Sequence, residues 1–342
     1  MRFRSGNADL AKFIASCLIM TYHIFIFGLR NYHFGTAWIY VEFFLIITGF
    51  FTARHFSTVK TEEPMKIAIR YTINKFLPLI PYTTIATVLM YLLLLVPLLV
   101  NGQLNFEEFL LSFTTDMPFD LLLISDAYAA PLVAPLWYLS ALIVVFPIFC
   151  YLLLRLDKYQ IMVFSALYFI LYYSYFGING ECAKAFLRMI AGLAVGSFLF
   201  ELSVMYEKYI KNISKSTLTI VELMTFAIPI YLTFSLQGNF RFIVLNFSVC
   251  LLLMLSNTTY TSLLSGRICS FLGKLSMPIF IIHWVVGKYI IEISNFYKMS
   301  IRVQLMLYYL LTILFSVMIM WIVGFIKNRK RTRFDDCIKS AR

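Results

Sequence analysis

Apolar segments of about 20 residues follow one another along the whole chain, separated by short polar joins. A segment of that length spans the hydrocarbon core of a bilayer as one helix, and a helix satisfies its own backbone hydrogen bonds there. The segments are expected at 13–30, 37–53, 77–100, 135–154, 160–176, 184–202, 217–236, 241–256, 270–292 and 303–326. The sequence therefore predicts an all-α, polytopic integral membrane protein with about ten transmembrane helices, in a single membrane domain over residues 1–326.

The composition supports this class and argues against others. Of the 342 residues, 61% are hydrophobic and only 13% are charged, whereas soluble domains carry about 25% charged residues. The net charge of +12 does not indicate a nucleic-acid partner, because the basic residues gather in short joins and in the tail. The six cysteines are scattered without a CxxC pair, which favours packing over disulfides or a metal site.

The charges of the joins predict the orientation in the membrane. Lysine and arginine gather in alternate joins, at 54–75, 155–158, 208–215 and 267, and in the tail at 327–342. By contrast, the stretch 101–133 carries five acidic residues and no Lys or Arg. Basic joins stay on the cytoplasmic side. We therefore expect both termini in the cytoplasm of an inner (plasma) membrane protein, with 327–342 as a basic cytoplasmic tail and 101–133 as an external loop.

Two ionisable residues lie in the chain's first expected helix: Lys12 just before the apolar segment 13–30 and His23 within it, with ten residues between them. Eleven steps of about 100° bring both side chains to one face of a helix, separated by a rise of about 16 Å. Lys12 then lies near a membrane surface and His23 near mid-depth. An ionisable group at that depth is costly and most often functional, so His23 is a candidate general base. The alternative is a buried histidine that hydrogen-bonds to a neighbouring helix.

Glu42 lies near the outer end of the second apolar segment, at a depth similar to that of His23. A carboxylate bonded to one ring nitrogen fixes the tautomer and makes the other nitrogen a better base, so we expect Glu42 to orient His23. The alternative for Glu42 is an ion pair that serves the fold. His283, well inside the ninth apolar segment, is either a second base or a packing histidine, and packing is the simpler interpretation.

Three basic residues, Lys12, Arg70 and Lys75, are expected to gather at the inner surface. One interpretation is anchoring, because basic side chains at this depth extend to the lipid head groups. The other is an anion site, in which lysines act as point charges toward the phosphates of a donor molecule that enters from the cytosol.

A pair of glycines, Gly192 and Gly196, forms a small-xxx-small pattern in RMIAGLAVGSF. Small residues at this spacing let another helix approach closely. We interpret the pattern as ordinary helix packing.

In combination, these motifs resemble acyltransferase family 3. ADLAK followed by His23 resembles the family's opening signature, an Asp-x-x-Arg/Lys before the first-helix histidine. VEFFLIITGFF resembles its second-helix motif, with Thr48 at the usual serine. Further blocks follow in the family's order: NKFLPLIPY, PLWYLSAL, FLRMIAGLAVG and LGKLSMPIFIIH. The sequence departs from the family at Thr72, because relatives often carry Arg-x-x-Arg there and only Lys75 remains.

The resemblance implies ten core helices and an O-acyltransferase that moves an acyl group, often acetyl, from cytoplasmic acyl-CoA. The implied acceptor is a hydroxyl of an envelope or exported glycan or glycolipid, and no metal is implied. By the same resemblance His23 is the catalytic histidine, Lys12 its paired basic residue and Glu42 a family acidic position. The anion site then holds CoA phosphates through Lys12 and Lys75, with Arg70 nearby, and the pantetheine arm carries the acyl group to mid-depth.

Two other functions stay open at this stage. A membrane carrier or flippase for a lipid-linked sugar or small anion would use the same charges as a pathway, without any dependence on CoA. A structural partner in an envelope assembly would use its polar residues only for packing, so substituting His23 would leave the glycan unchanged. Association of the chain with copies of itself is also left open.

The predicted orientation can be tested with a cysteine introduced at Asp116, after the six native cysteines are removed. We expect an impermeant thiol reagent to label this cysteine only from outside, because Asp116 lies in the acidic stretch. A cysteine placed in the tail at 327–342 should be labelled only from the cytoplasm and serves as the opposite control. Labelling of position 116 from the cytoplasm alone would invert the topology.

Overall fold

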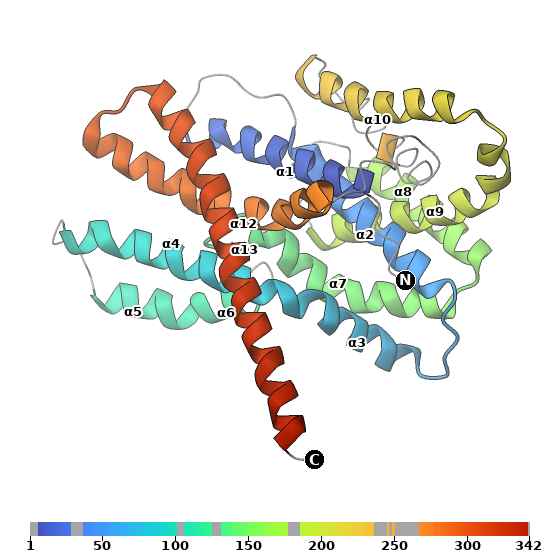
Figure 1. Ribbon diagram of the computed structural model, residues 1–342, viewed down its shortest axis with the longest axis horizontal. Helices are drawn as coiled ribbons and strands as arrows, with labels where there is room; N and C mark the ends of the chain where they lie inside the picture. The colour runs from blue at the N-terminus through green and yellow to red at the C-terminus, as the bar shows by residue number, and fades with distance from the viewer. Residues whose placement is uncertain are drawn as a thin grey trace.

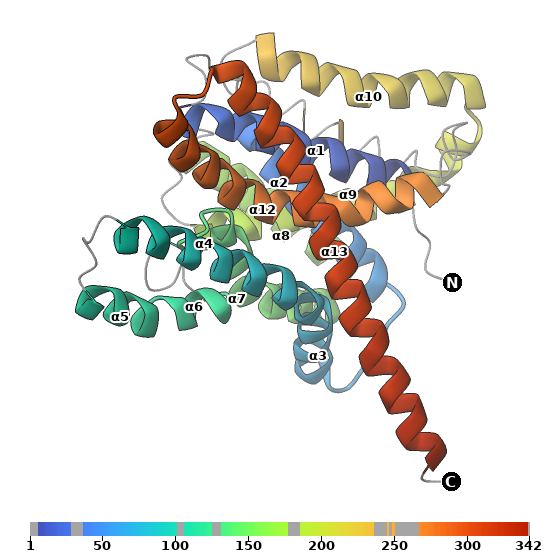
Figure 2. The same cartoon turned by 60° about the vertical axis from the view of Figure 1, so that its left-hand side comes forward.

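The computed structural model describes residues 6–28, 37–100, 106–124, 131–176, 185–235, 245, 248–249 and 267–340, and every regular element within them is helical. Figures 1 and 2 show these helices from two sides. The helices are α1 (Gly6–Ile26), η1 (Ala37–Ile39), α2 (Tyr40–Phe56), α3 (Pro64–Phe76), η2 (Leu77–Leu79), α4 (Ile80–Val100), α5 (Phe106–Thr115), α6 (Met117–Leu121), α7 (Leu136–Arg155), α8 (Lys158–Phe176), α9 (Ala185–Lys211), α10 (Lys215–Ser235), α12 (Arg267–Tyr297) and α13 (Ile301–Ser340).

Among the described residues, six helical segments are long and apolar enough to cross a membrane. They are Ala37–Phe56, Pro64–Leu95, Leu136–Arg155, Ala185–Lys211, Arg267–Ile293 and Ile301–Ile326. The predicted helical membrane class is confirmed, whereas ten transmembrane helices are not. Three further expected segments, 13–30, 160–176 and 217–236, fall largely in α1, α8 and α10, which are not among the six. The segment expected at 241–256 lies, except for three residues, outside the described part of the chain.

Polar stretches that the sequence suggested as joins are partly helical. The basic join before the third apolar segment contains α3, which begins with Pro64 and buries Ala68, Thr72 and Phe76 at a helical spacing of four. The stretch 101–133 contains α5 and α6, and the side chain of Asp120 there accepts a hydrogen bond from the Leu132 N–H at 3.2 Å. Amphipathic spacing and a proline at the first helical position favour helix over loop.

The expected tail is also helical for most of its length. Helix α13 is 40 residues long and continues to Ser340, so the predicted tail at 327–342 is largely an extension of this helix. Figures 1 and 2 show its C-terminal half projecting from the other helices.

Glycines bring α2 and α9 into close contact. A Cβ on Gly49 would lie 2.2 Å from the Leu193 carbonyl oxygen, and one on Gly196 would lie 2.1 Å from that of Ile46. A Cβ on Gly192 would lie 2.5 Å from the Leu45 Cβ. The predicted packing role of Gly192 and Gly196 is confirmed, and the two backbones meet where a side chain would keep them apart.

A second close pair joins α1 to α12. A Cβ on Gly287 would lie 2.2 Å from the Phe27 ring, and the hydroxyl of Ser16 donates a hydrogen bond to the Ser276 carbonyl at 2.8 Å. Helix α13 adds a third contact, because the Tyr308 hydroxyl donates to the Met20 carbonyl at 2.9 Å. These contacts set the register of α1 against α12, and that register decides which side chains of the two helices meet.

The α2–α9 contact can be tested with Gly196→Ala. The added methyl group would collide with backbone atoms of α2, and overpacking of this kind typically costs about 1–3 kcal/mol. We expect a lower thermal midpoint in detergent and less protein in the membrane. The matched control is Gly324→Ala on α13, where a Cβ meets nothing within 4 Å. Equal stability of the two variants would contradict the close packing.

Candidate active site

Two histidine rings meet between α1 and α12. The Nδ1 atom of His23 lies 2.9 Å from the Ile19 carbonyl oxygen and 3.2 Å from Nε2 of His283. The Nδ1 atom of His283 lies 3.0 Å from the Ile279 carbonyl oxygen. A carbonyl only accepts, so both Nδ1 atoms carry the proton in the neutral rings. Nε2 of His283 is then an acceptor, and His23 shares its Nδ1–H between Ile19 and His283.

This arrangement assigns the tautomer of His23. With the proton on Nδ1, Nε2 of His23 holds the lone pair and is the basic atom of the ring. No described residue hydrogen-bonds to this Nε2. His283 is completely buried, whereas His23 is only half-buried. His23 is therefore the more accessible ring, and His283 is the ring behind it.

Aromatic side chains line the histidine pair. The Trp284 ring lies edge-on to His23 with 5.5 Å between centroids, and Tyr22 lies edge-on at 5.4 Å. Phe27 contacts both His23 and Trp284, at 6.4 Å and 5.1 Å. An apolar wall of this kind limits the access of water to the ring and strengthens electrostatic interactions inside the site.

Glu42 does not occupy the predicted position beside His23. Its Oε1 accepts a hydrogen bond from Nε of Arg188 on α9, and the described contacts do not join it to the histidine. The group that contacts His23 Nδ1 from another helix is His283. The expected hydrogen bond between Glu42 and His23 is therefore absent from the described contacts, because α9 places a guanidinium next to the carboxylate.

Arg188 is the residue that the sequence reasoning missed. It lies in the block FLRMIAGLAVG, where the glycines drew attention to packing. The available signal was a charged residue in the first turn of a long apolar helix, since such residues are rare and usually paired. Two indoles also contact it: the rings of Trp38 and Trp137 each lie 5.3 Å from its guanidinium carbon.

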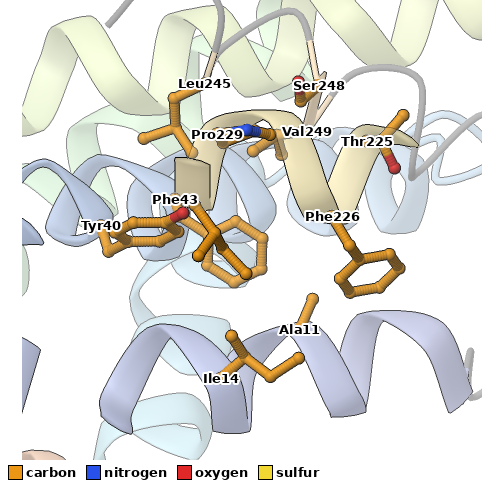
Figure 3. A pocket seen from close by; sticks show the side chains of 11 residues that line it. Ala11, Ile14, Tyr40, Phe43, Thr225, Phe226, Pro229, Leu245, Ser248 and Val249 are labelled. Carbon is orange, nitrogen blue, oxygen red and sulfur yellow. The ribbon is translucent and has the colours of Figure 1, made fainter. Parts of the chain in front are cut away.

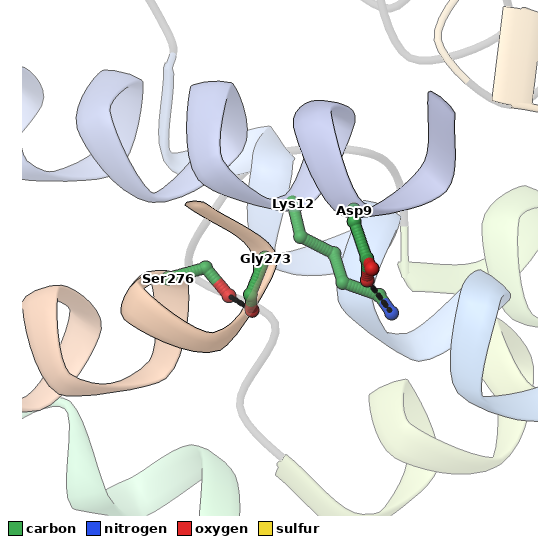
Figure 4. A network of polar contacts seen from close by, with 4 residues as sticks. All are labelled: Asp9, Lys12, Gly273 and Ser276. Carbon is green, nitrogen blue, oxygen red and sulfur yellow. Dashed lines mark hydrogen bonds and ion pairs between the residues drawn. The ribbon is translucent and has the colours of Figure 1, made fainter. Parts of the chain in front are cut away.

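The two predicted lysines meet at the other end of α2. Figure 4 shows Lys12 beside Asp9, with 3.5 Å between Nζ and Oδ1, and its ammonium lies 5.7 Å from the Phe51 ring. Lys75 lies 3.5 Å from the hydroxyl of Thr52, the residue next to Phe51. Consecutive residues of α2 thus bring Lys12 and Lys75 to one place, although they come from α1 and α3.

Arg70 does not join this cluster in the described contacts. It lies five positions before Lys75 on the same helix, and five positions turn a side chain by about 140°. Arg70 is exposed and makes no described hydrogen bond or ion pair. The structure therefore brings together two of the three predicted cationic residues.

Comparison with known proteins decides the family. The model of the family described as "Acyltransferase domain" matches residues 6–325, nearly the whole chain. The chain belongs to acyltransferase family 3. Comparison with curated proteins and with solved structures gives no match. Family membership and the apolar helices make the protein a membrane acyltransferase, and the resemblance recognised from the sequence is confirmed.

The structure also contains a small cavity, which neither the histidine pair nor the lysine pair lines. That cavity, of about 30 Å³, lies between α1, α2 and α10 (Figure 3). It holds roughly one water molecule, and no carboxylate, lysine, arginine or histidine lines it. No group of three or more His, Cys, Asp or Glu side chains suited to a metal occurs among the described residues.

Proposed function

We propose that the protein is a membrane O-acyltransferase that moves an acyl group, acetyl by preference, from cytoplasmic acyl-CoA to a hydroxyl of an envelope or exported glycan or glycolipid. The family supports the acyl transfer. The observation that carries the proposed mechanism is the position of His23, whose Nδ1–H is shared by the Ile19 carbonyl and His283. That arrangement leaves Nε2 as the atom that accepts a proton.

In the proposed reaction, Nε2 of His23 takes the proton of the acceptor hydroxyl as its oxygen attacks the thioester carbonyl carbon. The new carbon–oxygen ester bond forms, the carbon–sulfur bond breaks, and the CoA thiolate leaves with the electron pair. His23 then returns the proton to the thiolate, so the enzyme is regenerated. Protonated His23 keeps both Nδ1 acceptors, the Ile19 carbonyl and His283 Nε2, so the charged ring needs no rearrangement.

The donor end of the proposed site is the lysine pair. Lys12 and Lys75 converge on the C-terminal part of α2, at Phe51 and Thr52. Lysines bind phosphate as point charges, and Lys12 lies about 16 Å along α1 from His23. This separation suits a donor whose phosphates and thioester are far apart. We propose Lys12 and Lys75 as the ligands of the CoA phosphates, with Arg70 as an outer, exposed contributor.

The proposed base can be tested with His23→Ala. Loss of a general base typically lowers the rate by about 10²–10⁴-fold, so we expect acetyl transfer to fall below about one tenth of the wild-type rate at normal protein level. The measurement is ester acetate released from purified envelope glycan, with the protein quantified in the same membranes. Transfer above one tenth of wild type would remove His23 from the chemistry. Movement of a lipid-linked sugar or small anion across the membrane without any need for acyl-CoA would instead favour a carrier.

The companion variant of this test is His283→Ala. We propose His283 as a positioning residue, because it contacts the ring of His23 rather than a substrate. Ile19 still holds Nδ1 in this variant, so a smaller loss is expected than for His23→Ala, together with a shifted pH profile of kcat. A purely structural role would instead lower the amount of folded protein and leave the pH profile of the remainder unchanged.

The proposed donor site predicts a specific effect of Lys12→Ala. The apparent KM for acyl-CoA should rise more than that for the acceptor, and the difference should shrink as salt rises, because the Debye length is only about 8–10 Å at physiological ionic strength. Lys12→Arg should keep most of the activity. The matched control is Lys66→Ala, which removes an exposed lysine of α3 that pairs with Glu63. An equal rise of both KM values would contradict phosphate binding at Lys12.

A further inference from the structure

A polar cluster at the N-terminal ends of three helices is not used by the proposed chemistry. Glu42 lies in the first turn of α2, Arg188 near the start of α9 and Trp137 near the start of α7, with Trp38 in η1 just before α2. The ion pair between Glu42 and Arg188 and the contacts of both indoles with the guanidinium hold the four side chains together. We call these four residues the Glu42–Arg188 cluster.

The carboxylate of Glu42 has unused hydrogen-bonding capacity. Only 2% of the residue is exposed, and Oε1 is bonded to Arg188, whereas the buried Oε2 has no hydrogen-bond partner among the described residues. Leaving a buried charged acceptor unsatisfied is expensive. The cluster therefore offers a ligand an oxygen that accepts from a hydroxyl or an N–H group.

The indoles add the second half of a recognition surface. Trp38 and Trp137 are only half-buried, although the guanidinium that they contact is buried. An indole combines a broad apolar face with one polar group, and such a face packs against the C–H groups of a pyranose ring. A carboxylate for hydroxyls and an indole for the ring face are together the chemistry that binds a sugar.

The cluster is also connected to the histidine pair. Tyr138 follows Trp137 on α7, and its ring lies 5.7 Å from that of Phe280, which in turn lies 6.2 Å from His283. Along α2, Glu42 lies at the opposite end from Phe51 and Thr52, where the lysines converge. The cluster and the lysine pair thus occupy opposite ends of the same helix.

We infer that the Glu42–Arg188 cluster is the binding subsite for the sugar of the acceptor, with Glu42 Oε2 accepting from a sugar hydroxyl and an indole packing on the ring. This inference rests on the proposed function, because it assigns the acceptor to one end of α2 and acyl-CoA to the other. In an ion pair that serves only the fold, the four residues would affect the amount of folded protein and not the affinity for sugar.

The first test separates the two substrates kinetically. The probes are acetyl-CoA and the methyl glycoside that accepts acetyl best from a hexose and N-acetylhexosamine panel. Trp137→Ala should raise the KM for the glycoside about tenfold or more, as loss of a good binding contact does, and leave the KM for acetyl-CoA unchanged. The matched control is Trp321→Ala, an indole on α13 that is 72% exposed. Equal changes in both KM values would overturn the subsite.

A test of the Glu42–Arg188 ion pair requires a variant that lacks both charges and still folds. Removing one partner of a buried ion pair is strongly destabilising, whereas replacing both with apolar residues is often tolerated. The double variant Glu42→Leu/Arg188→Met should therefore accumulate and bind acetyl-CoA, yet lose affinity for the glycoside. A double variant with wild-type KM for the glycoside would show that the pair serves only the fold.

The second test measures binding without catalysis. The chain has four tryptophans, so Trp284→Phe/Trp321→Phe leaves only Trp38 and Trp137 as reporters. We expect a saturable change in their emission as methyl glycoside is added, and no such change when Glu42→Leu/Arg188→Met is added to this background. An absent or unchanged response would overturn the subsite. A saturable response in this variant, together with no acetyl transfer by the wild-type protein, would instead retain the subsite and overturn the proposed function.

Discussion

Close contact between helix backbones is the constraint on which the rest of the structure depends. In an apolar bundle a histidine or an ion pair is stable only when a second helix supplies its partner, and that helix must come near enough to do so. Gly49 and Gly196 allow this for α2 and α9, and Gly287 allows it for α1 and α12. Each glycine contact has a polar pair on the same two helices: Glu42 with Arg188, and His23 with His283. The glycines therefore let the helices bring these polar pairs together, without themselves contacting the polar side chains.

Features set by helical periodicity within one segment were predictable from the sequence. The helical class, the single face shared by Lys12 and His23, and the packing role of Gly192 and Gly196 follow from spacing and side-chain size alone. The convergence of Lys12 and Lys75 on neighbouring residues of α2 was also predictable, because the alternation of apolar segments puts their helix ends on one side. Periodicity in an apolar segment does not fix where a helix begins or ends, however. Helix α3 forms within the basic join before the third segment, and α13 continues into the stretch 327–342.

The partners across helices were not predictable, because they depend on which helices become neighbours. Arg188 is 146 residues from Glu42, and His283 is 260 residues from His23. A carboxylate and a histidine at similar depth suggested a pair, yet depth alone does not choose between several helices that reach the same level. The partners were decided by which helices pack together: α2 with α9 gives Glu42 its arginine, and α1 with α12 gives His23 its second histidine. The remaining predicted site residue, Arg70, is separated from Lys75 by the turn of its own helix.

A neutral partner behind His23 has consequences that a carboxylate would not have. A carboxylate stabilises the imidazolium as an ion pair and lets the ring hold a proton for long. The Ile19 carbonyl and the His283 nitrogen offer only dipoles, so the protonated ring stays costly in apolar surroundings. In the proposed reaction that cost favours rapid return of the proton to the departing thiolate. With Glu42 held by Arg188, the carboxylate stays away from His23. In the proposed subsite it accepts from a hydroxyl of the acceptor, so in this proposal the two ends of α2 bind different substrates.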